Sequence, residues 1–152
     1  MKTEHEAIIQ RVFPEVLEKM AFVFAEPADA QVVNELVDEK WLKASMAFSG
    51  HFGGELALII PEPLCAVFAE NMLGAADENS PQRAHDAFKE VLNVTCGNIL
   101  TEVAGEGPVF DLTVPQVNPL SNEDLTTLLQ GQDLLAFIIE DQPAFLQFSV
   151  FS

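Results

Sequence analysis

Residues 86–97 constrain this chain most, because as a helix they are apolar on one side and polar on the other. At about 100° per residue, four residues share an arc of roughly 60°. They are Asp86, Glu90, Asn93 and Gly97. The opposite side forms an apolar stripe suited to packing on a core. Its members are Phe88, Val91, Leu92, Thr95, Cys96, Ile99 and Val103. Glycine lowers helix propensity by about 1 kcal/mol relative to alanine, so its presence inside a helix calls for a reason. Because Gly97 has no side chain, it predicts an open place on the helix where a partner or ligand approaches.

Length and charge limit the classes of protein to consider. The chain has 152 residues, of which 49% are apolar, and no linker or composition shift divides it, so one globular domain over residues 1–152 is expected. Seven Lys and Arg stand against 24 Asp and Glu, a net charge of −17. Such a surface repels phosphate backbones and anionic lipids. We therefore expect no nucleic-acid or membrane partner, and instead a partner that presents lysine or arginine.

The cellular location of the protein is predicted from its apolar segments and its cysteines. Residues 1–6 lack the apolar core of a signal peptide, and no run of 18 apolar residues occurs. Cys65 and Cys96 lie in apolar helical patterns, which favours two buried thiols over a disulfide. A cytoplasmic protein is expected.

Hydrophobic periodicity predicts an α/β chain. Helices are expected over residues 4–26, 64–73, about 82–104 and 121–129. Strands are expected over residues 44–49, 55–60, 109–114, 134–140 and 144–151. Pro14 lies inside the first helix, residues 26–29 should end it, and residues 30–42 are ambiguous between a short helix and a loop. Hairpin connections are expected at 50–54 and 141–143, and caps at Gly74 and Ser121.

The two long helices resemble each other at an offset of 75 residues. Residues 13–18 (FPEVLE) match residues 88–93 (FKEVLN) in their apolar frame. Chance similarity between two amphipathic helices remains an alternative. The earlier helix has Arg11, Glu18 and Phe22 at the positions of Asp86, Asn93 and Gly97. We expect the Phe22 ring to fill the open place, so that the first helix keeps its packing and lacks a site.

The pattern Asp-x-x-x-Glu-x-x-Asn, followed some twenty residues later by proline, resembles the signature of the CheC/CheX/FliY family of CheY-P phosphatases. Here the residues are Asp86, Glu90, Asn93 and Pro115, with one residue fewer between Asn93 and Pro115 than the family's usual spacing. Residues 48–58 and 71–74 are similar to the family's first hairpin and to the end of its second helix. One complete motif beside one degenerate echo is most like CheX.

The resemblance implies a fold and a partner. The fold is the α/β (α+β) CheC-like fold, a mixed and largely antiparallel sheet on which two long pseudo-repeated helices pack. The substrate is an aspartyl phosphate on a CheY-type response-regulator receiver, in chemotaxis or another two-component pathway. CheX-type proteins form homodimers, and the apolar last strand, residues 145–151, is the candidate contact.

The resemblance also implies roles for the polar side. Asn93, whose carboxamide both donates and accepts hydrogen bonds, would orient the attacking water, and Glu90 would pair with the receiver's lysine. Asp86, Gly97 and Pro115 would contact the partner. Phosphoryl transfer depends mainly on positioning and charge stabilisation. No cofactor or metal of the chain's own is therefore expected, because the receiver brings the Mg²⁺.

The same residues allow three other interpretations. Acidic residues on the outer side of a helix often form only a solvated surface. A metal site built on Asp86, Glu90, Asn93 and His85 is disfavoured, because His85 points about 100° away from Asp86. The main alternative is a non-catalytic two-component signalling module that binds a receiver or another signalling protein through the same acidic side.

Overall fold

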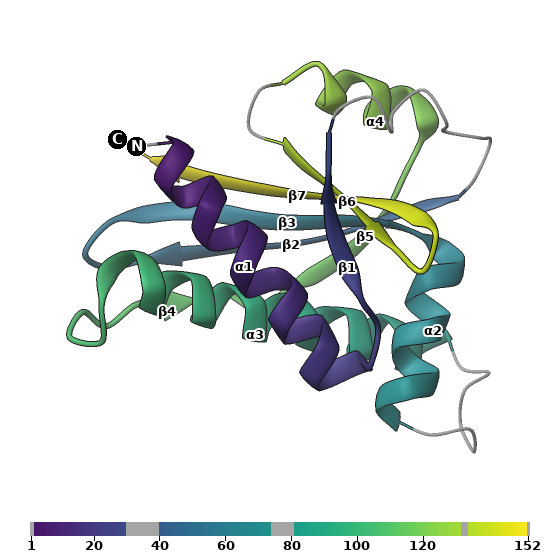
Figure 1. Cartoon of the computed structure of the whole chain (residues 1–152), viewed down its shortest axis with the longest axis horizontal. Helices are drawn as coiled ribbons and strands as arrows, with labels where there is room; N and C mark the ends of the chain where they lie inside the picture. Colours follow the sequence, from purple (N-terminus) through teal and green to yellow (C-terminus); the bar gives the residue numbers. More distant parts are fainter. Residues whose placement is uncertain (1, 30–39, 74–80, 132–133, 152) are drawn as a thin grey trace.

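The computed structural model describes residues 2–29, 40–73, 81–131 and 134–151. Along the described chain, α1 is followed by three strands, then two helices, two strands, one helix and two strands (Figure 1). The helices are α1 (Lys2–Ala21), α2 (Glu62–Leu73), α3 (Pro81–Ala104) and α4 (Asn122–Leu129). The strands are β1 (Ala25–Ala28), β2 (Trp41–Ser49), β3 (Gly53–Pro61), β4 (Asp111–Leu112), β5 (Gln116–Leu120), β6 (Leu134–Ile139) and β7 (Gln142–Phe151). Gly74, the rest of the expected loop up to residue 80, and residues 30–39 lie outside the described residues, whereas Trp41 and Leu42 belong to β2.

The strands form one seven-stranded sheet in the order β1-β6-β7-β3-β2-β4, and β5 also pairs with β2. Every pairing between described strands is antiparallel, which agrees with the predicted fold class. The predicted hairpin of β2 and β3 is confirmed, with Phe48 opposite Gly54. A Cβ at Gly54 would lie 2.1 Å from the Ser149 carbonyl oxygen and 2.5 Å from Cζ of Phe48, so only glycine fits under that ring.

Three helices cover one face of the sheet, and α4 covers part of the other (Figure 1). The larger core joins α1, α2 and α3 to side chains of β2, β3, β6 and β7. The predicted apolar stripe of α3 is confirmed, with Val103 only partly buried. Its buried side chains are Ala87, Phe88, Val91, Leu92, Thr95, Cys96, Ile99 and Leu100. α4 closes a second, smaller core around Trp41 and Phe145, and its predicted N-cap is confirmed, since Ser121 Oγ accepts a hydrogen bond from the Asp124 N–H at 3.0 Å.

The first helix is shorter than predicted. α1 ends at Ala21, not at residue 26, because Phe22 adopts the left-handed conformation with φ 55°. Asn71 Nδ2 donates a hydrogen bond to the Ala21 carbonyl at 2.7 Å, which satisfies one of the free carbonyls at the helix end. Residues that were expected to end the helix instead form β1, which pairs with β6. Phe22 is 68% exposed, so the prediction that its ring fills an open place on α1 is wrong.

The predicted strand at 109–114 is also shorter, and a following strand was missed. Only Asp111–Leu112 pairs with β2 as β4, and β5 then continues along the same edge of β2. Proline has no N–H to donate to a ladder. Pro115 therefore accounts for the interruption between β4 and β5.

The last hairpin turns at Glu140 and Asp141 rather than at 141–143. Both residues have positive φ, 49° and 65°, as a two-residue type I′ turn requires. The apolar last strand, β7, lies inside the sheet between β6 and β3. Among the described residues, its residues 148–151 pair with β3 alone, and its role as a homodimer contact stays a prediction.

Candidate functional site

An open hollow of about 350 Å³ lies between α3 and the segment Leu112–Pro115. Its lining residues are Asp86, Lys89, Glu90, Asn93, Leu112, Thr113, Val114 and Pro115. The structure thus brings Pro115 opposite the Asp-Glu-Asn pattern of the helix, although more than twenty residues separate them in sequence. The motif corresponds to one place on the surface.

The helical wall of this hollow is polar and accessible. Asp86 and Glu90 are exposed, and Asn93 is half-buried, while the opposite side of α3 is fixed in the core. Gln82 Nε2 donates a hydrogen bond to Asp86 Oδ1 at 3.0 Å, one helical turn earlier. The Asp86 carboxylate is therefore already engaged within the helix. For Glu90 and Asn93 no side-chain hydrogen bond is found within the described part of the chain, which leaves both available to a ligand.

The opposite wall is held by the backbone of β2. The Thr113 N–H donates to the Ala47 carbonyl, and Thr113 Oγ1 accepts from the Ala47 N–H, both at 2.9 Å. Val114 follows, 79% exposed, and Pro115 then interrupts the ladder. The wall is thus a fixed strand end with an apolar rim. Of this wall, only Pro115 was predicted from the sequence, because Leu112, Thr113 and Val114 belong to no motif.

Lys89 is the site residue that the sequence analysis missed. It is half-buried in the hollow, between Asp86 and Glu90 in sequence. No ion pair or hydrogen bond of Lys89 is found among the residues that the structure describes. A signal existed, since on a helical wheel Lys89 lies about 40° from Asn93. The hollow therefore combines two carboxylates, an amide and one cation.

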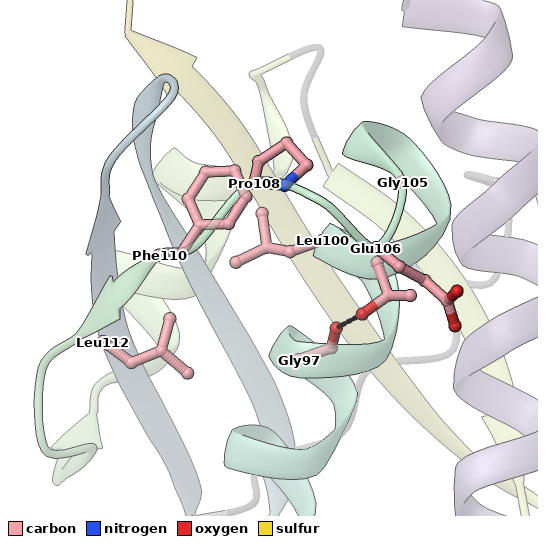
Figure 2. Close-up of a pocket in the computed structure, with 8 residues that line it drawn as sticks. Gly97, Leu100, Gly105, Glu106, Pro108, Phe110 and Leu112 are labelled. Carbon is pink, nitrogen blue, oxygen red and sulfur yellow. Dashed lines mark hydrogen bonds between the residues drawn. The ribbon is translucent and has the colours of Figure 1, made fainter.

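Gly97 does not line this hollow but a second one beside it, about 180 Å³ in volume (Figure 2). The second hollow lies between the C-terminal half of α3 and the segment that leads into β4. Its lining residues are Gly97, Leu100, Thr101, Gly105, Glu106, Pro108, Phe110 and Leu112. A Cβ added at Gly97 would meet nothing within 4 Å, so the expected open place is present. The Gly97 carbonyl accepts a hydrogen bond from Thr101 Oγ1 at 3.0 Å.

The matching side of α1 has different surroundings. Arg11, at the position of Asp86, donates a hydrogen bond to Glu102 of α3 and forms an ion pair with it. That hydrogen bond first, and then the charge of Glu102, raise the pKa of Arg11. Glu15, at the position of Glu90, lines a groove of about 170 Å³ between α1 and α3. Arg11 and Glu15 therefore face another helix, and no residue of a described strand lines this groove.

Among the described residues, no group of three or more His, Cys, Asp or Glu side chains is placed to hold a metal ion. Within the same residues, no helix is both long and apolar enough to cross a membrane.

Both cysteines are free and buried, as predicted. Burial raises the pKa of Cys96 from 9.0 to about 12, and burial followed by the charge of Glu62 does the same for Cys65. The Cys65 thiol donates to the Ala84 carbonyl of α3 at 3.2 Å. Thiols with such pKa values stay protonated at neutral pH, so neither is a nucleophile for this site.

The family model described as "Chemotaxis phosphatase CheX" matches residues 42–138, well over half of the chain. The chain belongs to the CheX family. The match runs from β2 to β6, so it includes α3 and both walls of the site hollow. No curated protein matches the sequence.

Solved structures of CheX proteins have the same fold at low identity. CheX from Vibrio vulnificus has a TM-score of 0.73 at 17% identity, with 99% of each chain covered. CheX from Desulfovibrio desulfuricans has a TM-score of 0.72 at 17% identity, with 97% of this chain and 99% of that chain covered. A third, from the CheX–CheY–BeF3–Mg²⁺ complex of Borrelia burgdorferi, has a TM-score of 0.63 at 14% identity, with 97% and 98% covered.

Proposed function

We propose that this CheX-family chain hydrolyses the aspartyl phosphate of a CheY-type receiver domain. The observation that carries the proposal is the site hollow, which Glu90, the unengaged Asn93 carboxamide and Pro115 line together. The family model describes phosphatases, and the similar Borrelia burgdorferi protein was solved as a complex with CheY, BeF3 and Mg²⁺. Both support a receiver as the partner.

Asn93 is the proposed water-orienting residue. Its carboxamide accepts and donates hydrogen bonds without ionising, so it can hold a water in line with the phosphorus and is not consumed. Its half-buried position on a helix anchored in the core limits its motion. Phosphoryl transfer depends on positioning and charge stabilisation, and the receiver supplies the Mg²⁺ and a lysine. The ordered water is the part that this chain would add.

Glu90 and Asp86 take different roles in the proposal. Glu90 is exposed and unengaged, so it can reach the partner's lysine and fix the docked orientation. Asp86 already accepts a hydrogen bond from Gln82 and is better suited to a longer-range attraction. Pro115 shapes the wall opposite them.

Lys89 can reduce the electrostatic repulsion between this acidic chain and a phosphorylated partner. A chain of net charge −17 approaches a partner site that itself carries a phosphoryl group, and like charges repel. Lys89 is a cation inside the site hollow with no partner among the described residues. We infer that it contacts a phosphoryl or carboxylate oxygen of the receiver and lowers this repulsion.

The test is phosphate release from a panel of phosphorylated receivers with Mg²⁺. Asn93→Ala should lower the acceleration by about 100-fold, since misplacing a reacting group costs that order. Glu90→Ala should chiefly raise KM. Glu18→Ala, at the equivalent position of α1, is the matched control and should behave as wild type. If the wild type binds a receiver but leaves the lifetime of its phosphate unchanged, the protein is a binding module and the phosphatase proposal is wrong.

A further inference from the structure

We propose that the second hollow, beside Gly97, seats an apolar side chain of the receiver that lies next to its phosphorylated aspartate. The inference rests on the proposed function and adds the half of the docking surface that the phosphatase motif does not describe. The docking surface would then bind the phosphorylated aspartate at the Asn93 end and an apolar side chain at the Gly97 end.

One wall of the second hollow is apolar, while Thr101, Glu106 and exposed backbone make the rest of its lining polar. Leu100, Pro108, Phe110 and Leu112 supply apolar surface, and the two glycines supply space. Among the described residues that line the hollow, Glu106 is the only ionisable one, and its carboxylate points away from Pro108 and Phe110 (Figure 2). The volume of about 180 Å³ exceeds that of an apolar cavity of about 150 Å³ that binds benzene. One aliphatic or aromatic side chain fits this space.

The two hollows form one continuous surface. They share Leu112, and Gly97 follows Asn93 by four residues, about 6 Å along α3. A partner that places its phosphoryl group at Asn93 therefore brings neighbouring residues over Gly97. The guest side chain has to come from the part of the receiver that surrounds the phosphorylated aspartate.

Exposed apolar side chains border both hollows. Val109 is 83%, Leu112 38% and Val114 79% exposed, and all three lie on the segment that walls the hollows. Single exposed apolar residues are ordinary, whereas several on one segment beside a site mark an interaction surface. These residues would exclude water around the docked partner.

Charge decides between a receiver and a second copy of this chain as occupant. A second copy would bring another net charge of −17 against Asp86 and Glu90. In the proposed function a receiver brings a lysine and Mg²⁺ to that end of the surface, so it adds positive charge where a second copy would add negative charge. The charged hollow and the apolar wall beside it are therefore complementary to a receiver.

The proposal is tested with a variant whose side chain fills the second hollow. Gly97→Leu places an apolar side chain where a Cβ meets nothing within 4 Å, and it replaces a poor helix former, so the variant should fold and melt at a higher temperature. It should weaken binding to a receiver loaded with beryllofluoride and Mg²⁺, and raise KM, by about tenfold or more, while kcat changes less than about twofold. Asn98→Leu is the matched control, because the next residue of α3 faces the α1 groove. It should bind as wild type.

A receiver variant completes the cycle. Shortening the receiver's apolar side chain beside the phosphorylated aspartate to Ala should weaken binding to wild type and have little further effect on Gly97→Leu. If Gly97→Leu binds its receiver as tightly as wild type, the second hollow is not a docking site. If the wild type binds receivers without releasing phosphate, the phosphatase proposal fails. The ratio of the Kd of Gly97→Leu to the Kd of wild type for the receiver still decides whether the second hollow is a docking site. If no receiver of the panel binds, both proposals are overturned.

Discussion

Helices α1 and α3 share an apolar frame and differ in what stands opposite their polar sides. At an offset of 75 residues, Phe13 matches Phe88, Val16 matches Val91, and Leu17 matches Leu92, and all six side chains are buried. The polar side of α3 faces a strand end across a hollow, whereas that of α1 faces α3 itself across a groove. The difference teaches that a helix of this kind becomes a site through the wall it faces as well as through its own residues.

The largest expected effect tests the shared frame. Phe13→Ala and Phe88→Ala should each lower the free energy of unfolding by about 3–5 kcal/mol, because both rings are fully buried. Phe13 packs edge-on against Phe137 with ring centroids 4.9 Å apart, and Phe88 packs in the same way on Phe68 at 6.4 Å. Urea unfolding measures both losses. A loss for one helix several times that for the other would mean that the two helices do not share one role in packing.

The second prediction tests whether the motif alone makes a site. Arg11→Asp with Glu18→Asn gives α1 the pattern of α3 around Glu15. Made together with Asn93→Ala, this change should leave phosphate release about 100-fold below wild type. The reason is that Arg11 and Glu15 line the groove against α3 and have no strand wall. Recovery of phosphate release in this triple variant would show that the wall is dispensable.

The third prediction concerns the thiol that α3 has where α1 has Ala21. The folded chain keeps the Cys96 proton up to about pH 12, while the unfolded chain loses it above about pH 9. Between these values the unfolded state binds fewer protons, so the free energy of unfolding falls as pH rises. Each buried thiol contributes a fall of about 1.4 kcal/mol per pH unit. Below about pH 9 the thiol is protonated in both states, and its full contribution to the free energy of unfolding is retained.

Urea unfolding of wild type and Cys96→Ala at pH 8 to 11 isolates this contribution, because all other groups titrate alike in both chains. The slope of the wild type should be steeper by the contribution of one thiol, and Cys65 should supply the remaining thiol-dependent slope. Equal slopes would mean that the Cys96 thiol becomes accessible to water in the folded state.

The smallest expected effect is a difference in KM between variants of Lys89 in α3 and of Lys19 in α1. Lys89 lines the site hollow, while Lys19 of α1 lines the groove between the helices. Lys89→Gln should raise KM for a phosphorylated receiver several-fold, more strongly at low salt, with kcat little changed, and Lys89→Arg should restore it. Lys19→Gln should have no effect. An equal rise for both lysines would indicate general charge rather than a contact in the hollow.

The sequence predicted the helix that carries the site because amphipathic periodicity over α3 is long and regular. It did not predict the end of α1, since nothing local shows that Phe22 takes a left-handed conformation or that Asn71, fifty residues later, caps Ala21. It missed β1 and β5 for a related reason. Both strands are short, and each is defined by the strand that it pairs with rather than by its own pattern.

For the site, sequence spacing placed Asp86, Glu90 and Asn93 on one side of a helix, and only the resemblance attached Pro115 to them. The remainder of the wall depends on tertiary structure. Thr113 belongs there because it is bonded to Ala47, and Gly97 belongs to a separate hollow because the chain returns along α3 before β4. Such contacts have no periodicity that a single sequence displays.

The interrupted ladder between β4 and β5 also bears on how a chain of this kind changes length. A residue gained or lost inside either strand would turn every later side chain of that strand to the other face of the sheet. At Val114 and Pro115 no ladder fixes the register, so the count there is free to change while both strands keep their pairing. The shortened interval between Asn93 and Pro115 is thus compatible with an intact site. A search that demands one fixed interval between the two residues would overlook chains of this kind.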